Sequence, residues 1–184
     1  MTDSEVTFNT ESLSGATLAR AGHEDIDKVW GLINEDSLWL LKTKGLDHWS
    51  LYYTREIVAE KIQKQEVFLV GKDSTPIATI TLGSNPVDYY TDKNLKCFTN
   101  PGAQALYISS LAVKPSFQHM GIAVKLMEFA ENQARSRGIR YLRLDCRAEY
   151  ADLVNFYLKR GYIQVDLFNE GDNHNYLLME KVIS

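Results

Sequence analysis

The sequence predicts an α/β (α+β) fold in which helices flank a mixed, mostly antiparallel sheet of about six or seven strands. The length of 184 residues suits one domain, because domains usually hold roughly 100–200 residues. Apolar residues make up 45% of the chain and charged residues 24%, which is ordinary for a globular protein with a buried core. Strand and helix patterns alternate in the second half, which favours a sheet covered by helices.

The first part of the chain is expected to hold an arm, one strand and two helices. Residues 1–15 are polar and lack periodicity, which predicts a flexible arm, and Ala16–Ala21 is predicted to be the first strand. Apolar residues at spacings of 0, 3, 4 and 7 from Ile26 predict an amphipathic helix, and an apolar patch continues toward Gly45. Thr54–Gln65 is predicted to form the second helix.

Two strand patterns separated by turn residues predict a hairpin in the middle of the chain. The strands are Glu66–Gly71 and Ile77–Gly83, and Lys72–Pro76 between them is rich in turn formers. Ser84–Gln104 follows as a long irregular stretch, and loops of this length inside a domain are often functional. Ala105–Val113 is rich in apolar residues, which predicts another strand.

The last third of the chain alternates helices and strands. Gly121–Arg137 is predicted to be a helix, and Gly138 is a residue that often ends helices. The remaining elements are, in order, strand Tyr141–Cys146, helix Ala151–Arg160, strand Tyr162–Leu167, turn Asn169–Asn173 and strand Asn175–Val182. No linker or repeat divides these elements, so the prediction is one domain over residues 16–184.

The segment from Leu111 to Ala123 carries the clearest sign of a binding site. A strand runs into a loop and then into the pattern Gln118-x-x-Gly121-x-Ala123 at the start of a helix. Small residues there let a ligand approach the backbone, and a helix N-terminus offers unpaired N–H groups and the positive end of the helix dipole. Such a site suits a phosphate or pyrophosphate. The pattern is neither a Walker loop nor a GxGxxG dinucleotide-binding fingerprint.

The distribution of charge agrees with an anionic ligand. The chain has 20 basic and 24 acidic residues, a formal net charge of −4. The stretch from Leu111 to Arg143 holds six basic and two acidic residues, a charge of +4, which leaves −8 for the rest. The overall acidity argues against a nucleic-acid-binding protein, which usually carries a basic excess. Arg135 and Arg137 lie near a helix C-terminus, where interaction with the helix dipole explains them better.

These motifs resemble those of the GNAT family of N-acetyltransferases. Leu111-Ala112-Val113, Pro115 and Gln118-His119-Met120-Gly121-Ile122-Ala123 resemble the acyl-CoA-binding motif of that family. Phe156-Tyr157-Leu158-Lys159-Arg160-Gly161-Tyr162 resembles its Phe-Tyr-x-Lys-x-Gly-Phe segment. The resemblance covers Leu106–Val165. It implies a single-domain GNAT-like fold in which the strand before Gln118 and the strand Tyr141–Cys146 splay apart to admit CoA.

The resemblance also implies a reaction and a set of site residues. It implies an N-acetyltransferase that uses acetyl-CoA as co-substrate and moves the acetyl group to a primary amine, which attacks the thioester directly. Tyr157 would be the general acid that protonates the departing thiolate, because a phenol stays protonated at neutral pH and can still donate. The implied cofactor-binding residues are Leu111, Ala112, Val113, Gln118, His119, Met120, Gly121, Ile122, Ala123, Val124 and Asn155.

Two positions depart from the family pattern. The family often has Asn seven residues before the tyrosine, where this chain has Tyr150, and Asn155 lies elsewhere on the helix. Some members carry a Glu base in the strand leading to Val113, and this strand has no carboxylate. The candidates for a base, if the reaction needs one, are Glu35, Asp36, His48, His119 and Asp145.

Other classes of protein fit the sequence less well. Cys97 and Cys146 are too few for a disulfide scaffold, and no His/Cys/Asp cluster has metal-ligand spacing, so no metal is expected. The N-terminus lacks the pattern of a signal peptide, and no apolar run reaches the ~18 residues of a membrane-spanning helix. We therefore expect a cytoplasmic protein that binds neither nucleic acid nor membrane.

The acceptor and the oligomeric state are the least defined features. The charge of −8 outside the cofactor segment favours a cationic amine, either a small molecule or a peptide. Tyr89, Tyr90 and Phe98, together with the aromatic-rich segment around His48, either border an acceptor pocket or simply pack. The resemblance also allows a homodimer. Two alternatives stay open: a non-catalytic acyl-CoA-binding or sensing domain of the same fold, and a protein-interaction module in which the loop is only structural.

Overall fold

The computed structural model describes residues 13–49, 53–64, 66–169 and 174–184. Most of the expected arm and most of the expected turn at Asn169–Asn173 lie outside the described residues. The strands are β1 (Thr17–Arg20), β2 (Val67–Lys72), β3 (Thr75–Gly83), β4 (Ala105–Val113), β5 (Tyr141–Arg147), β6 (Ile163–Asn169) and β7 (Asn175–Val182). The helices are η2 (His23–Asp25), α1 (Ile26–Lys44), α2 (Arg55–Gln63), α3 (Asp92–Lys96), η3 (Pro115–Phe117), α4 (Ile122–Ser136) and α5 (Ala151–Leu158).

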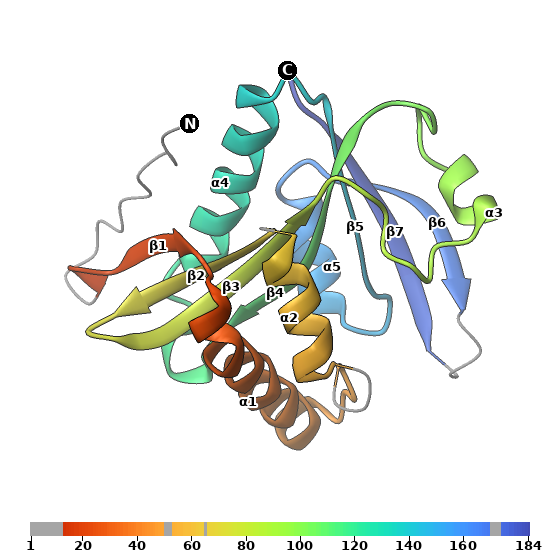
Figure 1. Cartoon of the computed structure of the whole chain (residues 1–184). Coiled ribbons are helices and arrows are strands. Elements are labelled where there is room, and N and C mark those ends of the chain that lie inside the picture. The colour runs from red at the N-terminus through yellow and green to blue at the C-terminus, as the bar shows by residue number, and fades with distance from the viewer. Residues whose placement is uncertain (1–12, 50–52, 65, 170–173) are drawn as a thin grey trace. The chain divides into compact units, whose positions relative to one another are not determined.

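The strands form one mixed sheet in the order β1-β2-β3-β4-β5-β7-β6 (Figure 1). β4 and β5 run parallel, whereas the pairs β1/β2, β2/β3, β5/β7 and β6/β7 are antiparallel. The predicted sheet class and the predicted number of strands are therefore confirmed. The chain divides into two compact units: unit 1 comprises Met1–Leu82 and Ser110–Phe129, and unit 2 comprises Gly83–Ser109 and Ala130–Ser184. β4 and α4 contribute residues to both units.

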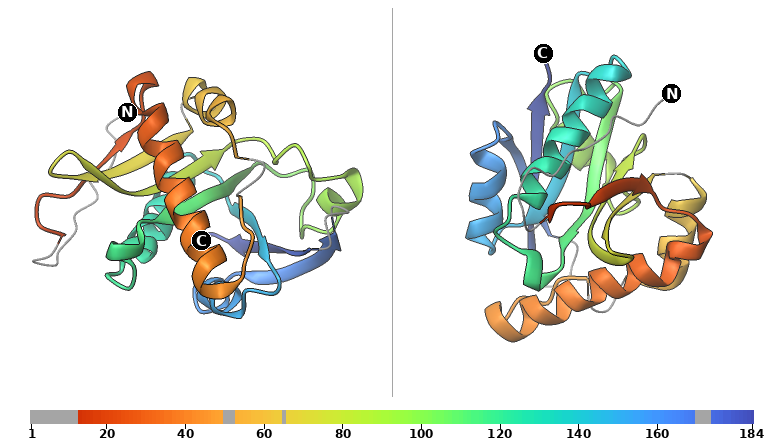
Figure 2. Two further views of the ribbon diagram at one scale, coloured as in Figure 1. Left: turned by 90° about the horizontal axis from the view of Figure 1, so that it is seen from below. Right: turned by 90° about the vertical axis from the view of Figure 1, so that its left-hand side faces the viewer.

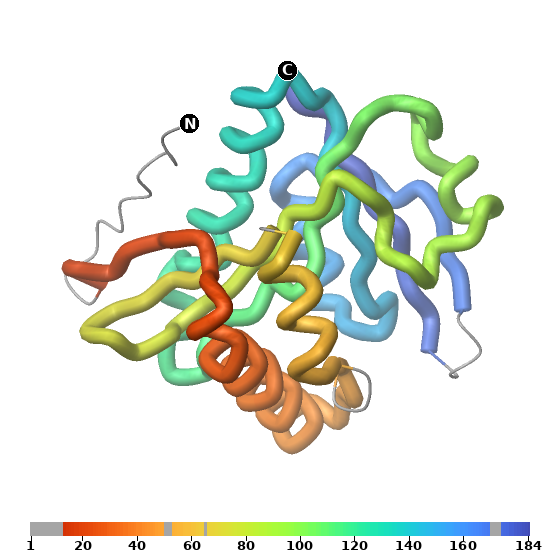
Figure 3. Tube along the Cα trace, in the orientation of Figure 1, coloured from red at the N-terminus to blue at the C-terminus, as the bar shows by residue number. Residues whose placement is uncertain are grey.

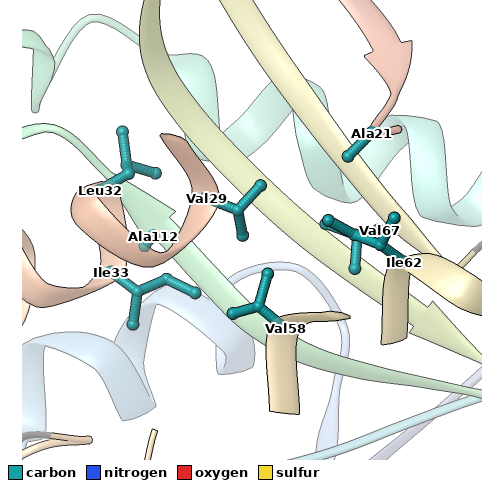
Figure 4. Packing of buried hydrophobic residues seen from close by; sticks show 8 residues of the cluster. All are labelled: Ala21, Val29, Leu32, Ile33, Val58, Ile62, Val67 and Ala112. Atoms are coloured by element: carbon teal, nitrogen blue, oxygen red, sulfur yellow. The ribbon is translucent and has the colours of Figure 1, made fainter. Parts of the chain in front are cut away.

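Unit 1 buries one face of its strands under α1 and α2, as the close view in Figure 4 shows. The apolar residues of α1 recur at helical spacing, so they form one stripe that meets the apolar side of α2. Thr54 begins α2, since its side chain accepts a hydrogen bond from the Ile57 N–H. The cluster consists of Ala21, Val29, Leu32, Ile33, Val58, Ile62, Val67 and Ala112.

The opposite face of β2 packs on the first part of α4. Successive strand residues point to opposite faces, so Phe68 faces away from the cluster that contains Val67. The ring centroid of Phe68 lies 4.8 Å from that of Phe129 in α4, in an edge-to-face arrangement. The hairpin of unit 1 is thus covered on both faces, and its path can be followed in the two views of Figure 2.

Unit 2 contains the antiparallel strands β5, β7 and β6, with the beginning of β4 beside β5. An aromatic cluster covers one face of these strands, and its members are Tyr90, Phe98, Ala105, Tyr107 and Leu178. Two of these aromatic residues come from the long segment between β3 and β4, whose path is traced in Figure 3. Unlike the cluster in unit 1, this one lies beside a buried ion pair between Arg143 and Glu180, 2.9 Å apart.

Most expected elements are present, with ends that differ by one or two residues, and two segments are more helical than expected. The apolar patch before Gly45 belongs to α1, which ends there with a left-handed glycine. The sequence predicts an irregular path for the whole of Ser84–Gln104, but this segment contains α3. Its start is a capping box: the Thr91 side chain accepts from the Asn94 N–H, and the Asn94 side chain accepts from the Thr91 N–H.

Candidate functional site

The predicted phosphate-binding loop lies in unit 1, between the end of β4 and the start of α4. After Val113, the chain makes the short η3 turn, in which the Phe117 N–H donates to the Lys114 carbonyl. The Lys114 N–H donates to the Ile77 carbonyl and so holds the start of the loop to β3. Pro115 stands at the first position of η3, where a missing N–H costs nothing. These bonds hold the first part of the loop in one conformation.

The second part of the loop has an unusual backbone. His119 has φ 63° and Gly121 has φ 81°, both in the left-handed region. That region carries little strain in glycine, which explains Gly at position 121. A Cβ built on Gly121 would meet no atom within 4 Å, so the space beside this backbone is open. A side chain there would project into this open space.

A row of N–H groups in this loop has no acceptor within the described part of the chain. The Lys125 N–H donates to the Gly121 carbonyl, which marks the first turn of α4. From His119 to Val124, by contrast, no N–H donates to any described residue. Unpaired N–H groups at a helix N-terminus, aided by the helix dipole, suit an anion. The loop therefore fits a phosphate or pyrophosphate, in agreement with the motif.

Gln118, the first residue of the motif, is held by a buried acid that sequence reasoning named only as a possible base. Its side-chain Nε2 donates to Asp36 Oδ1 at 3.0 Å and approaches the Val113 carbonyl at 3.4 Å. Asp36 lies on α1 and is 6% exposed. Burial raises the pKa of Asp36 from 3.8 to about 7, the bond from Gln118 opposes the rise, and Glu35 adds to it. α1 is thereby tied to the candidate phosphate loop.

The basic side chains of the cofactor segment are mostly paired with acids, which corrects the prediction made from net charge. Four of the six cations lie in ion pairs: Lys114 with Glu35, Lys125 with Glu128, Arg135 with Glu131, and Arg143 with Glu180. The net charge of the segment already includes Glu128 and Glu131, but it misses Glu35 and Glu180, which lie far away in the chain. The support for an anion therefore comes from backbone N–H groups more than from side-chain charge.

The three β4 residues expected to face the pantetheine arm differ in burial. Ala112 is fully buried in the unit 1 core, whereas Leu111 and Val113 are partly exposed. Ser110, just before them, has φ 51°, which interrupts the regular strand. Its hydroxyl lies 2.6 Å from that of Tyr53. This hydrogen bond links the irregular point of β4 to the segment that precedes α2.

Unit 2 holds the proposed general acid, Tyr157, on α5. Its side chain is 5% exposed and packs edge to face against Phe156 and Tyr162, with ring centroids 5.2 and 5.7 Å away. Burial is the main cause that raises the Tyr157 pKa, and Cys146 and Asp145 add to it. Among the described residues, no group hydrogen-bonds the Tyr157 hydroxyl. The phenol therefore keeps its proton, and its O–H group is available to donate a hydrogen bond.

The other residues predicted on α5 lie on different sides of the helix. Asn155 is exposed while Tyr157 is buried, so the two do not share a face. Tyr150, at the position where the family often has Asn, precedes the first residue of α5, and its carbonyl accepts from Leu153 and Val154. Unit 1 thus gathers the predicted loop residues, and unit 2 holds Tyr157 and Asn155.

The five candidate bases have very different surroundings. Glu35 is ion-paired with Lys114, and His119 is exposed on the loop. The His48 ring packs against the Trp49 ring in a tilted arrangement. The backbone carbonyl of His48 accepts a hydrogen bond from the Ser37 hydroxyl. Asp36 and Asp145 are the two carboxyl groups whose pKa burial raises.

Sequence reasoning missed one arrangement in unit 2. Asp145 Oδ1 accepts hydrogen bonds from the Tyr89 and Tyr90 hydroxyls, at 2.9 and 2.6 Å. The sequence named these three residues separately, and a separation of at least 55 residues leaves no local signal that joins them. Within the described residues, no group of three or more His, Cys, Asp or Glu side chains is placed to hold a metal ion. Nor is any described helix long and apolar enough to cross a membrane.

Comparison with known proteins gives a consistent set of matches. A family model described as "Acetyltransferase (GNAT) family" matches residues 30–162. An uncharacterised N-acetyltransferase of Bacillus subtilis (strain 168), YesJ, is 29% identical over 168 residues, which cover 89% of this chain and 88% of that protein.

Solved structures with the same fold were also found. A GNAT-family acetyltransferase from Streptococcus agalactiae superposes with a TM-score of 0.74 at 17% identity, covering 93% of this chain and 97% of that one. PaiA N-acetyltransferase from Thermoplasma acidophilum, solved in complex with coenzyme A, superposes with a TM-score of 0.66 at 19% identity, covering 91% and 98%. At these identities the likeness is one of fold.

Proposed function

Because this chain belongs to the acetyltransferase (GNAT) family and is an N-acetyltransferase, we propose that it moves the acetyl group of acetyl-CoA to a primary amine. The observation that supports CoA as the carrier of the acetyl group is the row of unpaired N–H groups from His119 to Val124 within the described part of the chain. These groups would bind the pyrophosphate, with Gly121 leaving room for it. The PaiA structure, which holds coenzyme A on the same fold, supports this assignment.

The proposed reaction is one displacement at the thioester carbon. The neutral amine attacks that carbon, the C–N bond forms, and the negative charge that develops on the carbonyl oxygen is stabilised by a backbone N–H of β4. The C–S bond then breaks. The nitrogen loses its extra proton to water or to a base, and the sulfur takes a proton from the Tyr157 hydroxyl, which solvent later restores.

The remaining predicted residues would position the two substrates. Leu111, Ala112 and Val113 would offer backbone groups to the pantetheine arm, as the edge of a strand does for an extended peptide. Asn155, exposed on α5, would contact CoA.

Two measurements on the full chain test this function together. Calorimetric titration with acetyl-CoA tests binding, and release of free thiol from acetyl-CoA with a panel of primary amines tests turnover. We expect binding and amine-dependent thiol release. Absence of binding at millimolar acetyl-CoA would exclude the function, whereas binding with no thiol release for any amine would indicate a domain that only binds acyl-CoA.

A further inference from the structure

A carboxylate in unit 2 is held by two tyrosines at a point where the sheet opens. Asp145 lies on β5, and Tyr89 and Tyr90 lie in the long segment between β3 and α3. Both hydroxyls donate to the same oxygen, Oδ1, at 2.9 and 2.6 Å. Tyr90 is 9% exposed, whereas Tyr89 is 45% exposed. The cluster is therefore buried on the side of Tyr90 and open to solvent on the side of Tyr89.

The negative charge of Asp145 has no cation to balance it within the described residues. Arg143, two positions earlier on the same face of β5, is already paired with Glu180 at 2.9 Å. No salt bridge from a described residue reaches Asp145, and its hydrogen-bonding side chains are neutral phenols. Burial accordingly raises the Asp145 pKa, and the two tyrosines oppose that rise. A carboxylate in this state would gain from a cationic ligand.

The pairing between β4 and β5 stops just before Asp145, whereas β5 stays paired with β7 there, Asp145 opposite Leu178. β4 and β5 are joined by three parallel pairs, which end at Tyr107 with Arg143. In the same register the next residues on that face would be Ser109 and Asp145. Within the described part of unit 2, however, no pair joins them. The Ser109 hydroxyl is buried and has no partner among the described residues. An unpaired hydroxyl and an unbalanced carboxylate thus lie where the pairing between β4 and β5 ends.

The same carboxylate is electrostatically linked to the proposed general acid. Asp145 and Cys146 are both among the causes that raise the Tyr157 pKa. Tyr157 and Asp145 both belong to unit 2. The group proposed to protonate the thiolate therefore lies within electrostatic range of the unbalanced carboxylate.

We propose that Asp145, Tyr89 and Tyr90 form the subsite that binds the acceptor as an alkylammonium ion, which gives one proton to solvent before its neutral nitrogen attacks the thioester. The inference rests on the proposed acetyl transfer, because it assigns the acceptor subsite of that reaction. An ammonium group carries three N–H donors and no acceptor. The carboxylate and the two phenol oxygens supply acceptors, and the partly exposed Tyr89 ring adds a face that attracts cations. A neutral alcohol of the same shape lacks the charge that Asp145 would balance.

The test is a binding titration that needs no turnover. The full chain, with and without saturating CoA, is titrated with n-butylammonium chloride and separately with 1-butanol, and the tyrosine ring resonances are followed by NMR. We expect a saturable shift with butylammonium and none with butanol. Asp145→Asn keeps the shape of the side chain and removes its charge, so it should weaken butylammonium binding about tenfold or more.

The matched control is Asp166→Asn. Asp166 also accepts a hydrogen bond from the long segment, from Asn94 Nδ2 at 3.5 Å, but it is not part of the cluster. This variant should bind butylammonium like the wild type. Equal weakening by both variants would mean that Asp145 only anchors the segment and would overturn the proposal.

Three further outcomes are decisive. Equal binding by wild type and Asp145→Asn, no saturable shift, or equal response to butanol would each overturn the ammonium subsite. Should Asp145→Asn fail to fold, Tyr89→Phe at an exposed position carries the same test and should weaken butylammonium binding severalfold. Calorimetry with CoA distinguishes the two proposals. If the wild type does not bind CoA, the proposed function is contradicted. If it binds CoA but not butylammonium, only this subsite is contradicted.

Discussion

Asp36 shows how a buried acid can be held by an amide instead of a cation. Its partner is the Gln118 side chain, and the neighbouring Glu35 is itself paired with Lys114. The folded chain keeps the Asp36 proton up to about pH 7, whereas an unfolded chain loses it near the ordinary value of 3.8. Folding stability should therefore fall as the pH rises from about 4 to about 7, because the folded state binds the extra proton over that range.

The Asp36→Asn variant should remove this pH dependence. The free energy of unfolding of the variant minus that of the wild type should be larger at pH 8 than at pH 5 by about 1–4 kcal/mol. One pKa unit corresponds to ~1.4 kcal/mol. Urea unfolding at both pH values measures the difference. Glu35→Gln is the control: this exposed ion pair with Lys114 should contribute less than ~1 kcal/mol at either pH. Identical pH dependence of stability in the wild type and Asp36→Asn would contradict the raised pKa of Asp36.

At Tyr157, removal of one hydroxyl separates catalysis from packing. Tyr157→Phe should lower kcat by about a hundredfold or more and leave the Kd for acetyl-CoA unchanged, because the acid acts only as the C–S bond breaks. The defect should grow as the pH rises, since solvent must then supply the proton. Tyr162→Phe is the control, since its hydroxyl is also buried and has no partner among the described residues. A kcat ratio that does not change with pH would exclude Tyr157 as the acid.

At the scale of elements, one ion pair joins three strands and a loop in unit 2. Arg143 of β5 donates to Glu180 of β7, to the Tyr107 hydroxyl of β4 and to the Asn100 carbonyl. Glu180 also accepts from the Thr99 N–H. Both charged side chains are at most 1% exposed, so each depends on the other.

Glu180→Gln should therefore destabilise the protein by about 3–5 kcal/mol, because it leaves the buried Arg143 without a counter-charge. The double variant Arg143→Leu/Glu180→Leu should recover much of that loss, since it removes both charges together. Urea unfolding measures all three proteins. Lys125→Ala, which breaks the exposed pair with Glu128, should cost less than ~1 kcal/mol. A double variant as unstable as the single one would show that the hydrogen bonds to the loop, and not the charge, dominate.

The elements also show where sequence patterns stop being informative. Helical spacing predicted α1 because a whole face of it is apolar, but α3 has five residues and too few turns to show a period. Its start signal was a capping box with Asn94 in place of the usual Glu or Gln. The sheet class was predictable, since strands and helices alternate along the chain, whereas strand order depends on pairs that the sequence does not mark.

For the whole molecule, the loop between β4 and α4 was predictable and the cluster around Asp145 was not. Glycine spacing at a strand-to-helix junction is a local pattern, so Gln118 to Ala123 could be read directly. The bond from Gln118 to Asp36 spans 82 residues, and the bond from Tyr90 to Asp145 spans 55. Contacts of that range are products of folding. The loop residues and Tyr157 remain predictions as to their roles in binding and catalysis.

The division of the chain between its two units bears on where the protein tolerates a cut. The chain passes from one unit to the other after Leu82, after Ser109 and after Phe129, and the last two crossings lie inside β4 and α4. A gene fragment that encodes either unit alone must break a strand and a helix in their middles. We therefore expect fragments cut after Ser109 or after Phe129 not to fold alone, because each cut divides a strand or a helix whose two parts belong to different units.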